Sequence, residues 1–223
     1  LINLGFAVTG SDLKETQVTR RLESIGARIY IGHKKENVAL CDAVVYSSAV
    51  RPDNPEVIAA RERSIPVIGR PEMLAELMRM KYGICITGTH GKTTTTSMTG
   101  MVLTKGGIDP TIIVGGRVTG FGGGAKTGSS HYLVLEADEY DRTFLKLTPA
   151  IAVVTNIDLE HLDCYHDLDD IYSAFLEFAN KVPFFGSVIL CIDDVGVQNI
   201  IPKITRRMIT YGISRQADIK AEN

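Results

Sequence analysis

The chain has 223 residues, of which 44% are hydrophobic and 22% charged, with a formal net charge of −2. This length suits one large or two modest domains with real hydrophobic cores, and we expect two. The interspersed charges argue against a nucleic-acid partner or an anionic membrane surface. No apolar stretch approaches the roughly 20 residues of a membrane span, and no signal peptide is visible.

The four cysteines are scattered without paired spacing. They are Cys41, Cys85, Cys164 and Cys191. This pattern favours free, buried thiols in a reducing compartment, hence a cytoplasmic protein, over a disulfide framework or a zinc site. The chain starts without methionine, in what reads as a helix end capped by Gly5, so we expect a fragment of a longer protein.

Strand-like and helix-like runs alternate in the first part of the chain. Strands are expected at 6–9, 27–31, 43–47 and 67–68, and helices at 17–25, 54–63 and 71–80. Alternation with apolar strands is typical of a parallel sheet covered by helices on both faces. We therefore predict an α/β domain over residues 1–82.

Polar pairs follow two of these expected strands, at the sheet edge where such folds bind ligands. Ser11 and Asp12 follow the first strand, and Ser47 and Ser48 follow the third. The carboxylate can accept from a ribose or a uracil, and the hydroxyls can meet phosphate or sugar. These four residues are substrate-binding candidates, although each pair could equally be a turn and helix cap.

A short loop leads from the apolar run 83–87 into a Thr-rich helical segment. It consists of Gly88, Thr89, His90, Gly91, Lys92, Thr93 and Thr94. Two glycines allow a tight turn that directs N–H groups at a phosphate, Lys92 can reach the outer phosphates, and Thr93 can hold magnesium. Because Ile86 stands where the full phosphate-loop pattern has glycine, this is a shortened form. The alternative is an ordinary strand-to-helix turn.

The rest of the chain alternates in the same way. Strands are expected at 111–114, 131–135, 151–155, 187–192 and 207–211, and helices at 171–179 and 193–201. The glycine-laden residues 115–116 and 120–128 read as a mobile loop. Residues 83–223 are thus predicted to form a second α/β domain built around the phosphate loop.

Glu136 and His161 each stand at or just beyond the end of an expected strand, on the edge where the phosphate loop must lie. Magnesium prefers oxygen ligands, so Glu136 and Thr93 make a sensible ligand pair. His161 could act through a water or meet a phosphate oxygen. A solvated acidic loop for 136–141 and a structural role for His161 remain open alternatives.

Four runs together resemble the Mur ligases. They are Gly-Thr-His-Gly-Lys-Thr-Thr-Thr-Thr at 88–96, Glu-Ala-Asp-Glu-Tyr-Asp at 136–141, Thr-Asn-Ile-Asp-Leu-Glu-His-Leu-Asp at 155–163 and Pro-Glu-Met-Leu-Ala-Glu-Leu-Met-Arg at 71–79. The resemblance implies a Rossmann-like domain that holds a UDP-sugar, followed by a P-loop ATPase-type domain. It also implies that the family's glycine-rich first turn and its C-terminal, amino-acid-binding domain are missing, so that the chain alone is inactive.

The activity that this resemblance implies is ATP-dependent amide ligation in peptidoglycan precursor synthesis. UDP-N-acetylmuramate, L-alanine and ATP would be the substrates, and Mg²⁺ the metal. By motif match, Lys92 would stabilise the transferring phosphoryl group, Thr93 and Glu136 would bind one magnesium ion, and His161 would help hold a second.

Two features bear on the branch of the family. The stretch 174–176 lacks the lysine that some Mur ligases carbamylate, which favours the alanine-adding branch. Tyr140 stands where many alanine-adding members have serine, which keeps the branch that recycles the murein tripeptide as an alternative. A phosphate-loop module that binds nucleotide without catalysis is the other alternative.

Overall fold

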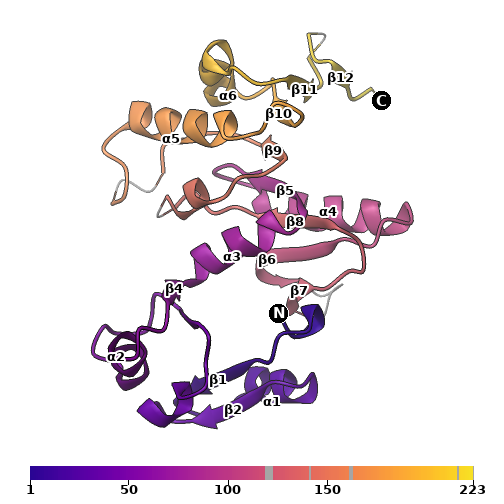
Figure 1. Cartoon of the computed structure of the whole chain (residues 1–223). Helices are drawn as coiled ribbons and strands as arrows, with labels where there is room; N and C mark the ends of the chain where they lie inside the picture. The colour runs from indigo at the N-terminus through magenta and orange to yellow at the C-terminus, as the bar shows by residue number, and fades with distance from the viewer. Residues whose placement is uncertain (119–122, 141, 161–162, 215, 223) are drawn as a thin grey trace. The chain divides into compact units, whose positions relative to one another are not determined.

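The computed structural model describes residues 1–118, 123–140, 142–160, 163–214 and 216–222 (Figure 1). Its internal contacts divide the chain into a first unit, residues 1–73, and a second unit, residues 74–223. Among the described residues, no helix combines the length and the apolar character needed to cross a bilayer.

The first unit alternates short strands and helices. Its elements are η1 (Ile2–Leu4), β1 (Thr9–Asp12), α1 (Gln17–Ser24), β2 (Arg28–Ile31), η2 (Lys35–Val38), β3 (Val44–Tyr46), α2 (Pro55–Glu62) and β4 (Val67–Gly69). Helix α3 (Arg70–Arg79) follows directly and runs into the second unit. Local sequence sets the helix starts: the Asn54 side chain accepts from the Glu56 N–H at the start of α2, and Pro55 occupies the first turn.

The strands of the first unit form two small parallel sheets, β1 with β2 and β3 with β4. Parallel pairing agrees with the predicted α/β class, but the expectation of one sheet covered on both faces is wrong for the described residues. The first strand was also misplaced, because the apolar run Phe6–Val8 precedes the paired residues and β1 itself is Thr-Gly-Ser-Asp. Ser11 and Asp12 therefore lie within β1 rather than after it.

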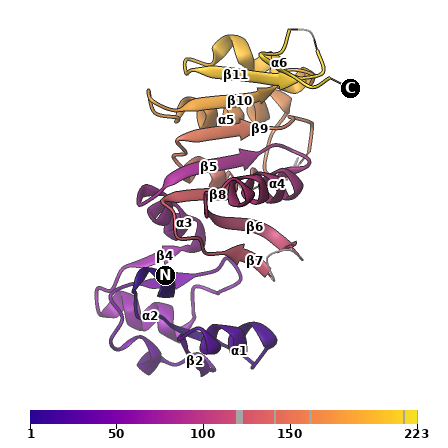
Figure 2. The same cartoon turned by 90° about the vertical axis from the view of Figure 1, so that its right-hand side faces the viewer.

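The second unit is built on a larger sheet. Its elements are β5 (Tyr82–Thr87), α4 (Lys92–Lys105), β6 (Thr111–Val118), β7 (Gly123–Lys126), β8 (Tyr132–Glu136), η4 (Thr143–Lys146), β9 (Ile151–Val154), α5 (Leu168–Asn180), β10 (Ser187–Cys191), α6 (Val195–Ile200), η5 (Ile201–Lys203), β11 (Met208–Gly212) and β12 (Ile219–Lys220). Within the described residues, the strand order is β12-β11-β10-β9-β5-β8-β6-β7, and Figure 2 shows it from β11 to β7. Every pairing is parallel except that of β6 with β7.

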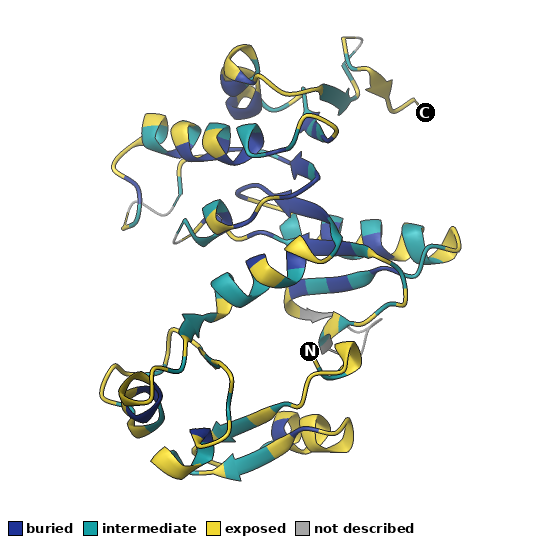
Figure 3. Cartoon of the chain, viewed as in Figure 1, coloured by how far each residue is buried: buried dark blue, intermediate teal, exposed yellow. Residues whose placement is uncertain are grey.

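The central strands are buried on both faces, which is why they read as continuous apolar runs (Figure 3). In β5, Cys85 packs into the larger core with α5, whereas Ile84 and Ile86 pack into the smaller core on the other side. Strand β8 alternates in the same way, with Leu133 and Leu135 on one side and Val134 on the other. Cys85 is buried, as expected, but the other three cysteines are only partly so.

The glycine-laden segment differs from the expected mobile loop. Strand β6 extends to Val118 and pairs antiparallel with β7, so most of the described part of this segment is a β-hairpin. Residues 119–122, which belong to the same prediction, lie outside the described residues. Pairing of Ile112 with Val134 and of Ile113 with Leu135 in β8 anchors the hairpin to the sheet.

Sheet order brings three strand ends together. Strand β5 lies between β8 and β9, and the register pairs Ile86 with Glu136 and Thr87 with Val154. In parallel strands the carboxyl ends meet at one edge. The loop after β5, the end of β8 and the segment after β9 are consequently neighbours.

Asp109 makes one end of the β6–β7 hairpin sensitive to acid. Its carboxylate accepts from the Ser129 N–H and hydroxyl and pairs with Lys126, and these bonds, led by the Ser129 N–H, lower the pKa of Asp109 to about 2. A lowered pKa gives stabilisation that is present above the ordinary value of 3.8 and is lost as pH falls toward 2. We expect Asp109→Asn to lower the urea midpoint near neutral pH, and the difference from wild type to vanish as pH falls from 4 to 2. A constant difference over that range would contradict this reading.

Candidate nucleotide-binding site

The loop after β5 opens onto a surface cavity of about 360 Å³. The residues that line it are Thr89, His90, Gly91, Lys92, Thr93, Thr94 and Glu136. Six of the seven predicted ATP-binding residues thus share one cavity with the predicted metal ligand Glu136. The remaining one, Gly88, is the first residue of the loop.

Helix α4 begins after two loop glycines with positive φ, and no side chain caps its first N–H groups. Gly88 has φ +137° and Gly91 has φ +78°, values that side chains disfavour. Gly91 is the N-cap of α4 and supplies no capping side chain. The first N–H groups of a helix have no partner inside the helix, and the helix dipole adds positive potential there. The cavity is therefore suited to bind an anion.

Lys92 is held by the loop and by a buried carboxylate. Its Nζ donates to the Gly88 carbonyl at 2.9 Å and to Oε1 of Glu139 at 2.9 Å, with Oε2 at 2.8 Å. The Lys92 side chain is 14% exposed and that of Glu139 only 2%. The ammonium group is thereby fixed at the edge of the cavity.

Glu139 is the residue whose position the sequence did not reveal, because it looked like one carboxylate among four in a solvated loop. Burial raises the pKa of Glu139, and the bond from Lys92 opposes that rise. The hydroxyl of Tyr165 donates to the Glu139 carbonyl at 2.6 Å, which holds its backbone in place. A solvated acidic loop does not describe this residue.

The structure brings Thr93 and Glu136 into direct contact. The Thr93 hydroxyl donates to Oε1 of Glu136 at 2.8 Å, and Oε2 accepts from the Gly115 N–H at 2.7 Å. A hydroxyl and a carboxylate side by side at a cavity edge form a hard-oxygen donor pair, which fits Mg²⁺. Among the described residues, no three or more His, Cys, Asp or Glu side chains are grouped so that they could hold a metal ion.

His161 and Asp141 lie outside the described residues, so the prediction for His161 stays a prediction. The segment before it is described. Asn156 and Asp158 contact the phosphate loop, with the Asp158 N–H donating to the Thr89 hydroxyl at 2.8 Å. His90 Nε2 is 3.6 Å from Oε1 of Glu160, and both side chains are largely exposed.

The four substrate-binding candidates belong to the first unit. Ser11 is partly buried and bonds to the Glu56 carboxylate at 2.6 Å and to Nδ1 of His33 at 3.0 Å. Asp12 is exposed at the end of β1. Ser47 and Ser48 are exposed in the turn after β3. The two pairs therefore lie on separate small sheets, and Ser11 has a structural partner that the sequence did not indicate.

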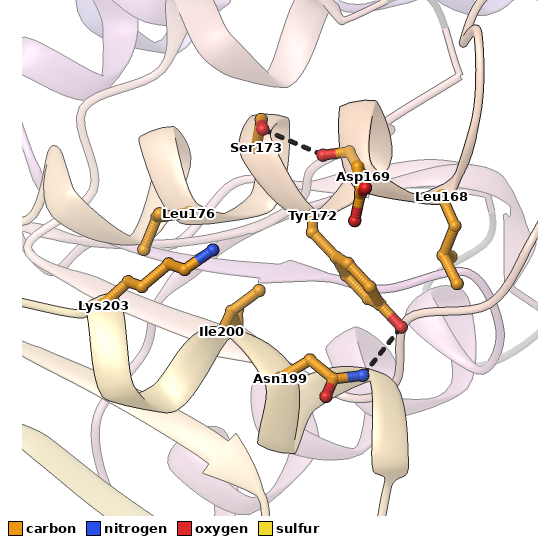
Figure 4. Close-up of a pocket in the computed structure, with 8 residues that line it drawn as sticks. All are labelled: Leu168, Asp169, Tyr172, Ser173, Leu176, Asn199, Ile200 and Lys203. Carbon is orange, nitrogen blue, oxygen red and sulfur yellow. Dashed lines mark hydrogen bonds between the residues drawn. The ribbon is translucent and has the colours of Figure 1, made fainter.

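A larger surface cavity, of about 540 Å³, lies between α5 and the α6–η5 segment (Figure 4). Apolar side chains of Leu168, Leu176 and Ile200 share its lining with polar groups, among them Tyr172, whose hydroxyl accepts from the Asn199 amide at 3.0 Å. None of its lining residues belongs to the phosphate-loop cavity. The start of α5 lies at this cavity, but the Asp167 side chain caps it by accepting from the Asp170 N–H, so size alone does not make the cavity the site.

Two family models match the chain. The Mur ligase family, catalytic domain, matches residues 1–82, and the Mur ligase middle domain matches residues 86–223. The UDP-N-acetylmuramate--L-alanine ligase of Geotalea uraniireducens is 60% identical over 99% of the chain, which covers 48% of that relative. That of Salinibacter ruber is 58% identical over the whole chain, which covers 47% of it. The chain therefore spans about half the length of the curated relatives it matches.

Solved structures of similar proteins agree with this fold. The UDP-N-acetylmuramate-alanine ligase of Thermotoga maritima superposes with a TM-score of 0.78 at 29% identity, over 97% of this chain and 49% of that one. The UDP-N-acetylmuramate:L-alanyl-gamma-D-glutamyl-meso-diaminopimelate ligase of Neisseria meningitides gives a TM-score of 0.78 at 28% identity, over 94% of this chain and 71% of that one.

Proposed function

The chain belongs to the Mur ligase family, and from this premise we propose that it is part of an ATP-dependent enzyme that joins L-alanine to the lactyl carboxylate of UDP-N-acetylmuramate. The names of relatives that are 55–60% identical to the chain support this choice of substrates. One structural observation carries the ATP-dependent step. The phosphate loop, Lys92, Thr93 and Glu136 converge on one cavity.

The proposed reaction has two steps. An oxygen of the lactyl carboxylate attacks the γ-phosphorus of ATP, the bond to ADP breaks, and an acyl phosphate forms. The amine of L-alanine then attacks the acyl carbon, the carbon–oxygen bond to phosphate breaks, and the nitrogen loses a proton as the amide forms. Phosphoryl transfer of this kind depends chiefly on positioning and on neutralising charge.

This chain's residues would supply those two effects. The N–H groups at the start of α4 would bind phosphate oxygens, and the glycines would let the triphosphate approach the backbone closely. The Lys92 ammonium donates to the Gly88 carbonyl, to Glu139 and, in a longer bond of 3.4 Å, to the Thr89 carbonyl, so it would exchange that long bond for one to a phosphate oxygen. Glu139 would thereby position Lys92.

The oxygen pair of Thr93 and Glu136 would hold Mg²⁺. Bound there, the ion supplies positive charge against the phosphate oxygens. Thr93 and Glu136 are already oriented toward each other, because Glu136 is fixed by the Gly115 N–H. His161 remains the proposed ligand of a second ion.

The first unit is proposed to hold the UDP-sugar through Ser11, Asp12, Ser47 and Ser48. Ser47 and Ser48 are exposed and free to approach a ligand phosphate, as their position after a parallel strand suggests. The Ser11 hydroxyl is bonded to Glu56 and His33, so these two side chains would orient it toward the ligand.

A second candidate is ligation of the murein tripeptide in place of L-alanine. Tyr140 and the similarity to the Neisseria structure favour it. We rank it below alanine ligation because relatives that are 55–60% identical to the chain are named alanine ligases, whereas the Neisseria recycling ligase is 28% identical.

Phosphate release from ATP by a full-length version of the protein tests the proposal. We expect release only when UDP-N-acetylmuramate and L-alanine are both present, and little with glycine, serine or the tripeptide in place of alanine. Release with UDP-N-acetylmuramate and the tripeptide, but not with UDP-N-acetylmuramate and L-alanine, would transfer the assignment to the recycling reaction. Release that needs neither substrate would contradict a ligase and favour a phosphate-loop switch.

Glu136 and Glu139 offer a matched pair for the metal assignment. Glu136→Gln is expected to raise the magnesium concentration for half-maximal activity about tenfold, because it removes one charged ligand. Glu139→Gln should leave that concentration nearly unchanged and should instead lower thermal stability, since it deprives the buried Lys92 of its counter-charge. Equal shifts in the two magnesium titrations would contradict the assignment.

A further inference from the structure

The segment after β9 contacts the phosphate loop through two residues that the proposed chemistry does not use, Thr155 and Asn156. The Asn156 side chain makes two bonds to one residue, His90: Oδ1 accepts from the His90 N–H at 2.7 Å, and Nδ2 donates to the His90 carbonyl at 3.0 Å. Because a backbone N–H only donates and a carbonyl only accepts, the two partners also fix which way the amide points.

Thr155 also bonds to the phosphate loop. Its hydroxyl lies 2.9 Å from the His90 carbonyl and 3.2 Å from the Thr87 carbonyl. The backbone takes part as well, since the Thr89 N–H donates to the Asn156 carbonyl at 3.1 Å. The approach is so close that a Cβ on Gly88 would lie 2.1 Å from the Thr155 hydroxyl oxygen. The loop is thus bonded at Thr87, Thr89 and His90 from one neighbouring segment.

These contacts bear on how the loop is held without a ligand. A glycine-containing loop has many conformations, and fixing each residue costs free energy that a ligand must otherwise supply on binding. Asn156 and Thr155 satisfy the backbone N–H and carbonyl of His90, which fixes the peptide immediately before the N-cap Gly91. None of these contacts moves the residues that line the cavity.

We propose that Asn156 and Thr155 form a clasp that sets the phosphate loop in its anion-binding conformation before ATP arrives. Both are positioning residues: they act on the phosphates through His90 and Gly91. Opening the clasp makes the loop adopt other conformations, and the apparent ATP affinity becomes the intrinsic affinity multiplied by the fraction of molecules that keep the competent one. The statement about ATP rests on the proposed function, whereas the statement about the loop does not.

Hydrogen exchange of the nucleotide-free chain tests the clasp directly. Asn156→Ala is compared with Asn180→Ala, a matched control whose side chain accepts from the N–H and hydroxyl of Thr205, far along the sheet from the loop. We expect Asn156→Ala to speed exchange in the peptide covering residues 88–94 and to leave β10 and β11 unchanged. Asn180→Ala should leave residues 88–94 unchanged. Asn156→Asp keeps an acceptor for the His90 N–H but replaces the donor to the His90 carbonyl by a charged oxygen, so it should also speed exchange and serves if the alanine variant does not fold.

Binding of an ATP analogue with magnesium gives the second readout. Asn156→Ala should raise the Kd about tenfold, which corresponds to about 1.4 kcal/mol, with the UDP-sugar Kd unchanged. Thr155→Ser, which retains the hydroxyl, should bind nearly as wild type, whereas Thr155→Ala should weaken binding. Unchanged exchange at 88–94 in Asn156→Ala would overturn the clasp. If wild type itself fails to bind the analogue, the proposed function fails, and the exchange result still decides the clasp.

Discussion

Lys92→Ala is expected to lower the rate of ligation by a full-length version of the protein about 10³-fold or more, because loss of one preorganised donor to a reacting oxyanion has an effect of roughly this size. The UDP-sugar Kd should change little, since the candidate residues for that ligand lie in the first unit and Lys92 lies in the second. Rates of phosphate release and calorimetric Kd values for the UDP-sugar measure the two effects.

In Lys92→Ala, a loss of folding stability must be distinguished from a loss of catalysis. Removal of Lys92 leaves the Glu139 carboxylate, 2% exposed, without its counter-charge, and we expect a loss of about 3 kcal/mol in unfolding free energy. The double variant Lys92→Ala/Glu139→Gln should recover much of that stability and none of the activity. Lys105→Ala, at the exposed far end of the same helix, is the control and should retain both. Equal loss of UDP-sugar binding and ligation in Lys92→Ala would contradict the assignment.

Gly88→Ala should be the most damaging single change in the loop. The residue has φ +137°, and an added Cβ would lie 2.1 Å from the Thr155 hydroxyl oxygen and 3.0 Å from the Asn156 carbonyl oxygen. Relief of the first contact requires Thr155 to turn away from the carbonyls of Thr87 and His90. We expect a loss of at least about 3 kcal/mol from backbone strain and lost contacts together, and no measurable ATP binding.

Gly91→Ala separates strain from steric overlap. Gly91 also has positive φ, at +78°, but its nearest neighbour to an added Cβ is the Thr95 hydroxyl at 4.0 Å. The variant should therefore lose only about 1 kcal/mol, the cost of a left-handed conformation for alanine. Denaturant unfolding of both variants supplies the comparison. Similar losses for the two would show that the overlap at Gly88 is not what restricts that position.

The sequence predicted the second unit well because its strands are buried on both faces. Runs such as Tyr82–Thr87 and Ile151–Val154 are apolar for that reason, and their order along the chain alternates with helices. The phosphate loop and its meeting with Glu136 could be predicted as well, since parallel strands bring their ends to one edge. The local sequence pattern was sufficient to predict a residue's position where that position follows from the end of a strand.

Other features depend on contacts that no local pattern encodes. Glu139 and Asp138 are neighbours in an acidic run, yet only Glu139 is buried, because Lys92 and Tyr165 bind it from other parts of the chain. The bonds from Asn156 to His90 join residues 66 positions apart. In the first unit, the apolar run Phe6–Val8 suggested a strand, but pairing with β2 begins at Thr9. The β6–β7 hairpin was hidden because its glycines favour a loop by composition alone.

The proposed function requires a triphosphate bound at the start of α4 with its metal ion beside the end of β8. A structure of the protein with a non-hydrolysable ATP analogue and Mg²⁺ measures this directly. We expect the phosphates to lie against the N–H groups of residues 91–94, a phosphate oxygen within hydrogen-bond distance of Lys92 Nζ, and the metal ion bound by Thr93 Oγ1 and Glu136. A nucleotide bound elsewhere, or a metal ion remote from Glu136, would contradict it.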